Sequence, residues 1–202
     1  MRRFDWLVVL FSVAYVAVAT ALTFRTGNDE FGFYVAVLAI LAVFIGFVHL
    51  KIRLHPLCLL GLSIWGLAHM AGGLAPSPGG EADGVLYNWW LIPGRLKYDN
   101  IVHAYGFGLS TWTVWQGLRT RLADPTPTFG LLFCAACAGM GLGALNEIVE
   151  FIAVLTIPDT NVGGYVNTGW DLVSNFTGAT TAAVAIYFLD RSSKSSKARA
   201  SS

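Results

Sequence analysis

The chain has 202 residues, of which 55% are hydrophobic and only 12% are charged, and its formal net charge is +1. Soluble domains carry about a quarter charged residues, so this composition excludes an ordinary soluble domain and indicates a membrane protein. With so little net charge, and basic residues only in loops and at the ends, we expect no nucleic-acid partner.

Six segments are long enough to cross a bilayer as helices, which takes roughly 20 apolar residues. In chain order they lie near 6–24, 31–50, 56–74, 98–118, 129–156 and 170–189. The fourth is the least hydrophobic. The fifth is over-long and carries Gly139, Gly141 and Gly143, which favour a tilt, a kink or close packing against a neighbour. The expected fold class is an all-α, polytopic transmembrane bundle of about six helices.

The basic residues predict the orientation of this bundle. With six crossings, ten of the 13 lysines and arginines fall on one side, and only Arg25, Arg95 and Lys97 fall on the other. Because cytoplasmic loops are enriched in lysine and arginine, both termini are expected in the cytoplasm. We expect residues 1–190 to form a single transmembrane domain and residues 191–202 to form a disordered basic cytoplasmic tail.

The first segment leaves one alternative open. "MRRFDWLVVLFSVAYVAVATA" has a basic start, an apolar run and an A-T-A near its end, which is also the pattern of a cleaved signal peptide. The apolar run is long for a signal peptide, so we expect a retained helix.

Four of the segments carry polar residues that a membrane interior disfavours. They are His69, Asp99, His103, Glu147, Glu150, Asp171 and Asn175. At 1.5 Å of rise per residue, all fall about 0–14 Å below the outer interface. Spacings of three or four residues put neighbours in the same segment on one helix face. Because an ionised side chain facing lipid at mid-membrane costs about 2.5–3.5 kcal/mol, these faces are expected to turn inward and meet.

Four acids in one layer need compensation. Two like charges about 5 Å apart repel by about 3 kcal/mol at an effective dielectric of about 20. Either some acids hold protons at neutral pH, which suggests a proton relay, or a cation lies among them. A divalent metal ion suits imidazole and carboxylate ligands. The candidate ligands are His103, Glu147, Glu150 and Asp171, with His69 as a fifth, and Asp99 orienting His103.

Several motifs carry a resemblance. "LAHMAGG", "YDNIVH", "NEIVEF" and "GYVNTGWDLVSNFTGA" resemble those of the YjdF-type integral membrane proteins, which are related in pattern to the VanZ-like family. The resemblance covers about residues 30–190 and implies a multi-pass helical protein of the prokaryotic cytoplasmic membrane. It places the seven polar residues on motif positions but brings no settled reaction. In one departure, Asn167 stands where an acid is expected before the last helix.

The first functional hypothesis is a divalent-metal-dependent enzyme that acts at the outer leaflet on a lipid or lipid-linked envelope substrate. Its catalytic candidates are Asp99, His103, Glu147, Glu150 and Asp171, and its substrate-binding candidates are Arg95, Lys97 and Asn175. The external cations are placed to meet an anionic headgroup. The lipid bilayer is the expected partner, and the metal ion is the expected cofactor.

Two alternatives come from other classes. One is a proton- or cation-coupled transporter, which needs polar residues along a full crossing path, whereas the inner half of every expected segment lacks acids. The other is a non-catalytic structural or assembly protein. In such a protein, amides and hydroxyls could join the helices at a lower desolvation cost than four acids. Whether the protein is an enzyme stays open at this point.

Overall fold

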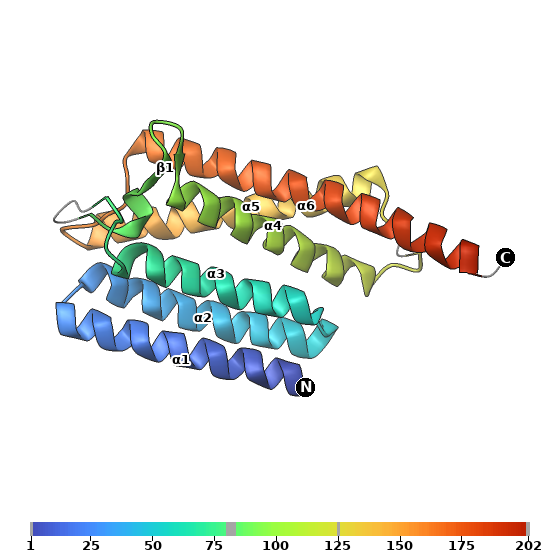
Figure 1. Ribbon diagram of the computed structural model, residues 1–202, viewed down its shortest axis with the longest axis horizontal. Coiled ribbons are helices and arrows are strands. Elements are labelled where there is room, and N and C mark those ends of the chain that lie inside the picture. Colours follow the sequence, from blue (N-terminus) through green and yellow to red (C-terminus); the bar gives the residue numbers. More distant parts are fainter. Residues whose placement is uncertain (1, 80–83, 125, 201–202) are drawn as a thin grey trace.

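The computed structural model describes the backbone of residues 2–79, 84–124 and 126–200, with side chains up to residue 192. This part of the chain forms α1 Arg3–Thr26, α2 Asp29–Ile52, α3 Pro56–Leu74, α4 Tyr98–Arg119, α5 Phe129–Thr156 and α6 Tyr165–Ala200. The helices run side by side along the long axis, and both chain termini lie at the same end (Figure 1). The expected all-α bundle is confirmed.

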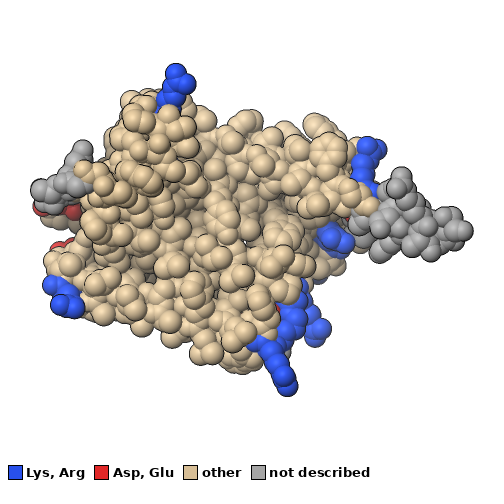
Figure 2. Space-filling view, viewed as in Figure 1, with Lys and Arg blue, Asp and Glu red and all other residues tan. Residues whose placement is uncertain are grey.

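Five helices, α1, α2, α3, α5 and α6, are long and apolar enough to cross a membrane. Their outer surface is almost uncharged, and lysine and arginine gather mainly at the end that carries the termini (Figure 2). α4 has 22 residues, about 33 Å of helix, and is less apolar because it buries Asn100, His103, Ser110 and Thr111 among its neighbours. A multi-pass membrane protein is confirmed, while the sixth crossing stays a prediction.

The expected tail falls largely outside the described residues. The apolar span of α6 ends at Ser192, and its helical backbone runs on to Ala200. The side chains of residues 193–200 and all of residues 201–202 lie outside the described part, so the tail at 191–202 stays a prediction.

The helices form two layers of three (Figure 1). α1, α2 and α3 make one layer, and α4, α5 and α6 make the other. α3 packs against both α1 and α4, so it joins the two layers. The unusual polar residues of α4, α5 and α6 therefore belong to a single tightly packed group of helices.

Glycines on α5 allow this close packing. A side chain at Gly139 would collide with Thr111 of α4, and one at Gly143 would collide with Asn175 of α6. Gly141, by contrast, faces open space. Two of the three glycines therefore bring helix backbones together, as small residues do between membrane helices.

Local signals set the helix ends. Gly27 ends α1 in the left-handed region, with φ of 63°, which glycine adopts without steric cost. The Asn28 side chain then accepts a hydrogen bond of 3.0 Å from the Phe31 amide and caps α2. Pro56 opens α3 at a position where a helix needs no N–H donor.

A small hairpin that the sequence does not signal precedes α4. After the 3-10 turn η1 Leu86–Asn88, the strands β1 Trp90–Ile92 and β2 Leu96–Lys97 pair antiparallel around Gly94, whose φ is 69°. β2 leads directly into Tyr98, the first residue of α4. The hairpin therefore sets where the polar face of α4 begins.

A second polar group lies at the end that carries both termini. Asp5 is 1% exposed and lies 3.1 Å from the guanidinium of Arg2 and 3.3 Å from Nε2 of His49. Arg2 also donates a hydrogen bond of 2.7 Å to the carbonyl oxygen of Leu54. These contacts tie α1 to α2 and to the turn after it.

Candidate metal centre

Five side chains from α4, α5 and α6 meet in one place, which we call the acid–histidine cluster. They are Asp99 and His103 of α4, Glu147 and Glu150 of α5, and Asp171 of α6. His103 is at the centre and is 1% exposed. Its Nε2 lies 3.5 Å from Asp99 and 3.8 Å from Glu150, and its Nδ1 lies 3.5 Å from Glu147. The sequence prediction that these residues come together is therefore in agreement with the geometry.

Both ring nitrogens of His103 face oxygen atoms. Besides the carboxylates, Nδ1 lies 3.1 Å from Oδ1 of Asn175, one turn beyond Asp171 on α6. A neutral imidazole carries only one N–H, so it cannot donate on both sides. The other nitrogen can then be met by a second ring proton, by a proton on a neighbouring carboxyl group or by a cation.

Amide side chains hold two of the carboxylates in place. Nδ2 of Asn167 donates to Asp171 at 2.6 Å and to Asp99 at 3.3 Å, so it links α6 to α4. Asn100 donates to the other oxygen of Asp171 at 3.4 Å. Asn167, where an acid was expected, thus serves as a donor to acids.

A third amide holds Glu150. Nδ2 of Asn146 donates a hydrogen bond of 2.8 Å to Oε1 of Glu150, four residues later on α5. Sequence reasoning missed Asn146 and Asn100 as site residues. The available signal was their position: each lies beside or one turn from a cluster acid, and buried carboxylates require donors.

Glu147 lacks such a donor. The residue is 9% exposed, and neither of its side-chain oxygens accepts a hydrogen bond, because His103 at 3.5 Å is not in hydrogen-bonding geometry. A buried ionised carboxylate without a partner costs roughly several kcal/mol unless a cation compensates its charge. Glu147 is therefore the acid in the described cluster that most requires either a proton or a cation.

The cluster fits a divalent metal ion in its spacing and its ligand types. Two groups of three share His103, one with Asp99 and Asp171 and one with Glu147 and Glu150, and within each group the ligand atoms lie within 4.8 Å of one another. Metal–ligand bonds of about 2.0–2.2 Å place opposite ligands about 4.4 Å apart, so a small contraction would close either group around an ion. One imidazole among carboxylates suits Mn²⁺, Fe²⁺ or Zn²⁺.

His69 lies beside the cluster but outside both groups of three. Its ring centroid is 6.2 Å from that of His103, and its Nδ1 contacts the Tyr87 hydroxyl. Burial raises the pKa of the Tyr87 hydroxyl well above its usual value, so the hydroxyl keeps its proton, and which partner donates in this contact depends on the His69 tautomer. The free ring nitrogen of His69 is then Nε2.

Lys97 and Arg95, the two cations expected near the cluster, occupy different places. Lys97 donates a hydrogen bond of 3.2 Å to Asn167 and lies 5.2 Å from the ring centre of Trp90, so it stands one side chain away from the cluster. Arg95 is exposed on the hairpin and borders a separate groove of about 370 Å³ beside Trp170. The structure brings Lys97 to the cluster and does not bring Arg95 there.

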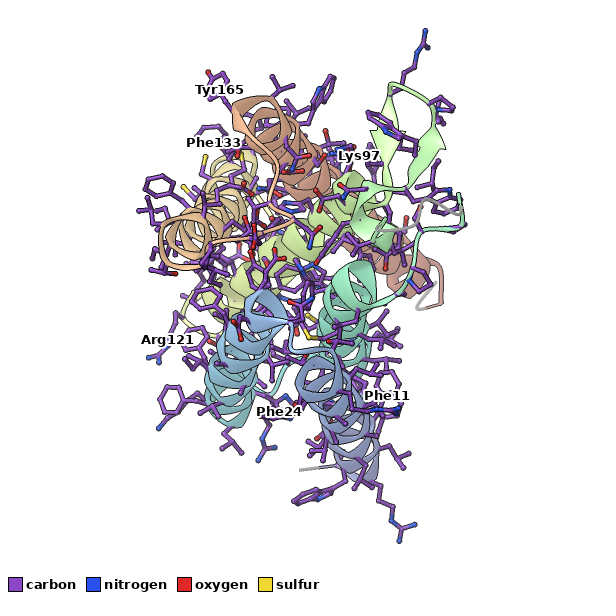
Figure 3. All side chains as sticks on the ribbon, turned by 90° about the vertical axis from the view of Figure 1, so that its left-hand side faces the viewer. Phe11, Phe24, Lys97, Arg121, Phe133 and Tyr165 are labelled. Atoms are coloured by element: carbon purple, nitrogen blue, oxygen red, sulfur yellow. The ribbon has the colours of Figure 1, made fainter. Side chains whose placement is uncertain are left out.

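A large cavity adjoins the cluster. It has a volume of about 980 Å³ and lies between the two helix layers. Its end beside the cluster is bordered by Glu30, His69, Asp99, Glu150 and Asn161, and its remaining walls are mainly apolar. Viewed along the helices from the hairpin end, nitrogen and oxygen atoms gather between the two layers (Figure 3). The cluster therefore opens into a cavity large enough for a ligand.

Glu30 fastens the connection between α5 and α6 over this cavity. Both Glu30 oxygens accept the Asn161 backbone N–H at 3.0 Å, and one accepts the Asn161 amide at 2.9 Å. We expect Glu30→Ala to speed hydrogen exchange at residues 157–164 and to lower the free energy of unfolding by about 1–3 kcal/mol. Asp29→Ala, which alters an exposed neighbouring acid, is the control. Equal exchange in both variants would contradict this role.

Comparisons with known proteins place the chain without naming a reaction. No curated protein matches it, and no solved structure matches it. Residues 7–192, nearly the whole chain, match the family described as "Predicted membrane protein (DUF2238)". The match agrees with the helical bundle and its apolar surface. This multi-pass membrane protein therefore belongs to the DUF2238 family.

Proposed function

We propose that this protein is a divalent-metal-dependent enzyme that acts at the outer leaflet of the membrane on a lipid or lipid-linked substrate. The ligands would be His103, Glu147 and Glu150, with Asp171 and Asp99 in the adjoining group of three. The substrate class is a molecule with a phosphoryl or acyl group next to a hydrocarbon chain. The cavity beside the cluster supports this choice, because it joins an apolar space to a group of acids.

The observation that carries the proposal is the state of Glu147. Its two oxygens are buried without a hydrogen-bond donor, beside a histidine whose two nitrogens already face oxygens. Lys97, the nearest cation in the described site, is bonded to Asn167 rather than to a cluster acid. A divalent cation compensates both Glu147 and the remaining negative charge.

Each side chain of the site would have its own role. A bound divalent ion supplies Lewis-acid chemistry, which lowers the pKa of water or polarises a phosphoryl or acyl oxygen. Asp99, one turn from His103 and 3.5 Å from its Nε2, orients the ring. Asn146 and Asn167 fix the carboxylate positions, and Asn175 positions His103. Lys97 supplies positive charge at the outer edge for an anionic headgroup.

The membrane placement is part of the same proposal. The excess of lysine and arginine near the termini supports cytoplasmic ends, which put the cluster in the outer leaflet. The motif resemblance to YjdF-type and VanZ-like proteins supports a prokaryotic cytoplasmic membrane. Arg95, which the structure leaves exposed on the hairpin, would meet headgroups at the membrane surface.

The test is metal-dependent turnover of lipid. Purified protein in nanodiscs of a bacterial polar lipid extract is incubated with Mn²⁺, Zn²⁺ or a chelator, and the lipids are analysed by mass spectrometry. We expect one lipid species to be consumed only with metal and wild-type protein, and we expect Glu150→Gln to lose at least tenfold in rate. An unchanged lipid profile under every metal condition would overturn the proposed reaction class.

A cation-coupled transporter is the second candidate, and one observation favours it. The cavity reaches from Glu150 to Ile52 and Arg121, near the end that carries the termini. Counterflow of labelled cations in proteoliposomes tests this function, with Glu147→Gln as the inactive control. If neither turnover nor counterflow occurs, and the cluster variants fold normally, the structural or assembly hypothesis gains support.

A further inference from the structure

The cavity between the helix layers continues far beyond the acid–histidine cluster. Glu150 and Asp99 border one end, and Gly46, Ile52 and Arg121 border the other. At 1.5 Å of rise per residue, the stretch from Glu30 to Gly46 on α2 measures about 24 Å, most of the roughly 30 Å hydrocarbon thickness of a bilayer. The cavity is therefore long and runs along the helices.

The cavity is also open sideways, between α2 and α5. Leu41 and Phe44 of α2, and Leu142 and Leu145 of α5, all line it and are all among the exposed apolar side chains. α2 makes its main contacts with α1 and α3, on its other sides. Because these exposed walls lie within the apolar span of the protein, the molecules that reach this opening are membrane lipids.

We propose that this cavity binds one hydrocarbon chain of a membrane lipid, which enters between α2 and α5 and places its phosphate-bearing headgroup at the acid–histidine cluster. The headgroup part of this assignment rests on the proposed metal-dependent function. The chain part rests on the cavity alone.

The dimensions match a chain of one leaflet. Glu150 lies six residues before the end of α5 at Thr156, about 9 Å below it. A chain that fills one leaflet, half of the roughly 30 Å core, adds about 15 Å. A lipid whose headgroup sinks to Glu150 therefore ends about 24 Å deep, near the depth of Gly46, and the cavity continues past this point to Ile52 and Arg121. The recessed cluster explains why an apolar cavity continues below the membrane midplane.

The charge at the outer end restricts the headgroup. Glu30, Asp99 and Glu150 border the cavity there, and they would repel a bare phosphate. A divalent ion among the carboxylates reverses this repulsion, and Lys97 adds a positive charge one side chain away. A phosphate-bearing headgroup therefore binds only when the ion is present, whereas the chain needs only the apolar walls.

Photocrosslinking tests the chain site. The probe is phosphatidic acid with a photoreactive diazirine at the end of one long acyl chain, in phosphatidylcholine nanodiscs. Gly46→Phe places a ring in the cavity, because Gly46 lines it and a Cβ atom there meets no atom within 4 Å. Gly141→Phe is the matched control, because Gly141 also meets nothing within 4 Å and is exposed outside the cavity.

We expect adducts to concentrate on the cavity walls at Phe44, Leu142 and Leu145. Gly46→Phe should reduce them at least tenfold, and Gly141→Phe should leave them unchanged. Adducts that are as frequent at exposed Phe133 and Phe176 of the outer surface, or that persist fully in Gly46→Phe, would overturn the chain site.

Competition separates the two parts of the assignment. With Mn²⁺ present, unlabelled phosphatidic acid should displace the probe at least tenfold better than diacylglycerol, and Glu147→Gln should abolish this preference while the adducts remain. Equal competition by both lipids would overturn the headgroup assignment. If Gly46→Phe removes the adducts but wild-type protein neither keeps metal nor turns over lipid, the chain site stands and the proposed function fails.

Discussion

Replacing Glu147 by glutamine is expected to remove bound metal from the protein. Wild-type protein purified in detergent, loaded with Mn²⁺ or Zn²⁺ and desalted, should retain about one ion per chain, and Glu147→Gln should bind at least 100-fold more weakly. The reason is that Glu147 is the buried carboxylate without a hydrogen-bond donor, so a bound cation would compensate its charge. Elemental analysis by plasma mass spectrometry gives the stoichiometry directly.

Two further variants make this measurement specific. Asp159→Asn removes the same charge from an exposed acid between α5 and α6, so it should leave the metal content unchanged. Asn146→Ala removes only the donor that holds Glu150, so affinity should fall about 10–100-fold, which is less than for Glu147→Gln. Wild-type protein without metal, or equal metal in wild type and Glu147→Gln, would contradict the metal centre.

The sequence was sufficient to predict the helices and the convergence of the cluster. Long apolar segments can satisfy their backbone hydrogen bonds in lipid only as helices, so five helices were clearly predicted from the sequence. The segment of α4 was correctly predicted to be the least hydrophobic. Glu147 and Glu150 are three residues apart, and this spacing places both side chains on one face of a helix. The high cost of turning acids to lipid then assigns that face to the interior. These are local or energetic rules that need no knowledge of helix neighbours.

Other features depended on which helices become neighbours. Asn167 reaches Asp99 of α4 only because α6 packs against α4. The ion pair of Asp5 with His49 joins residues 44 positions apart. The cavity reflects the shape of two helix layers that meet mainly through α3. Hydropathy and spacing carry no information about such long-range packing.

Removing metal is expected to make Glu147→Gln more stable than wild type, and adding metal is expected to close most of this difference. Without metal, a pair of ionised carboxylates about 5 Å apart costs about 3 kcal/mol at an effective dielectric of about 20. Glutamine at position 147 removes one of these charges and adds an N–H donor, so the variant should be the more stable protein under chelation. With metal at about 100 times its Kd, wild type gains about 2.7 kcal/mol, which removes most of this difference in stability.

Thermal unfolding in detergent, followed by tryptophan fluorescence, compares the stability of wild type and Glu147→Gln with metal and with chelator. For a chain of this length, 1 kcal/mol corresponds to about 2–4 °C, so metal should raise the Tm of wild type by about 5–10 °C and leave Glu147→Gln nearly unchanged. A cluster that only joins helices predicts a different result: chelator would not affect wild type, and the loss of a charged group from His103 would destabilise the variant in every condition. The metal dependence of this stability difference therefore distinguishes a metal centre from a structural polar cluster, because only a bound cation offsets the cost of the Glu147 charge in one condition and not in the other.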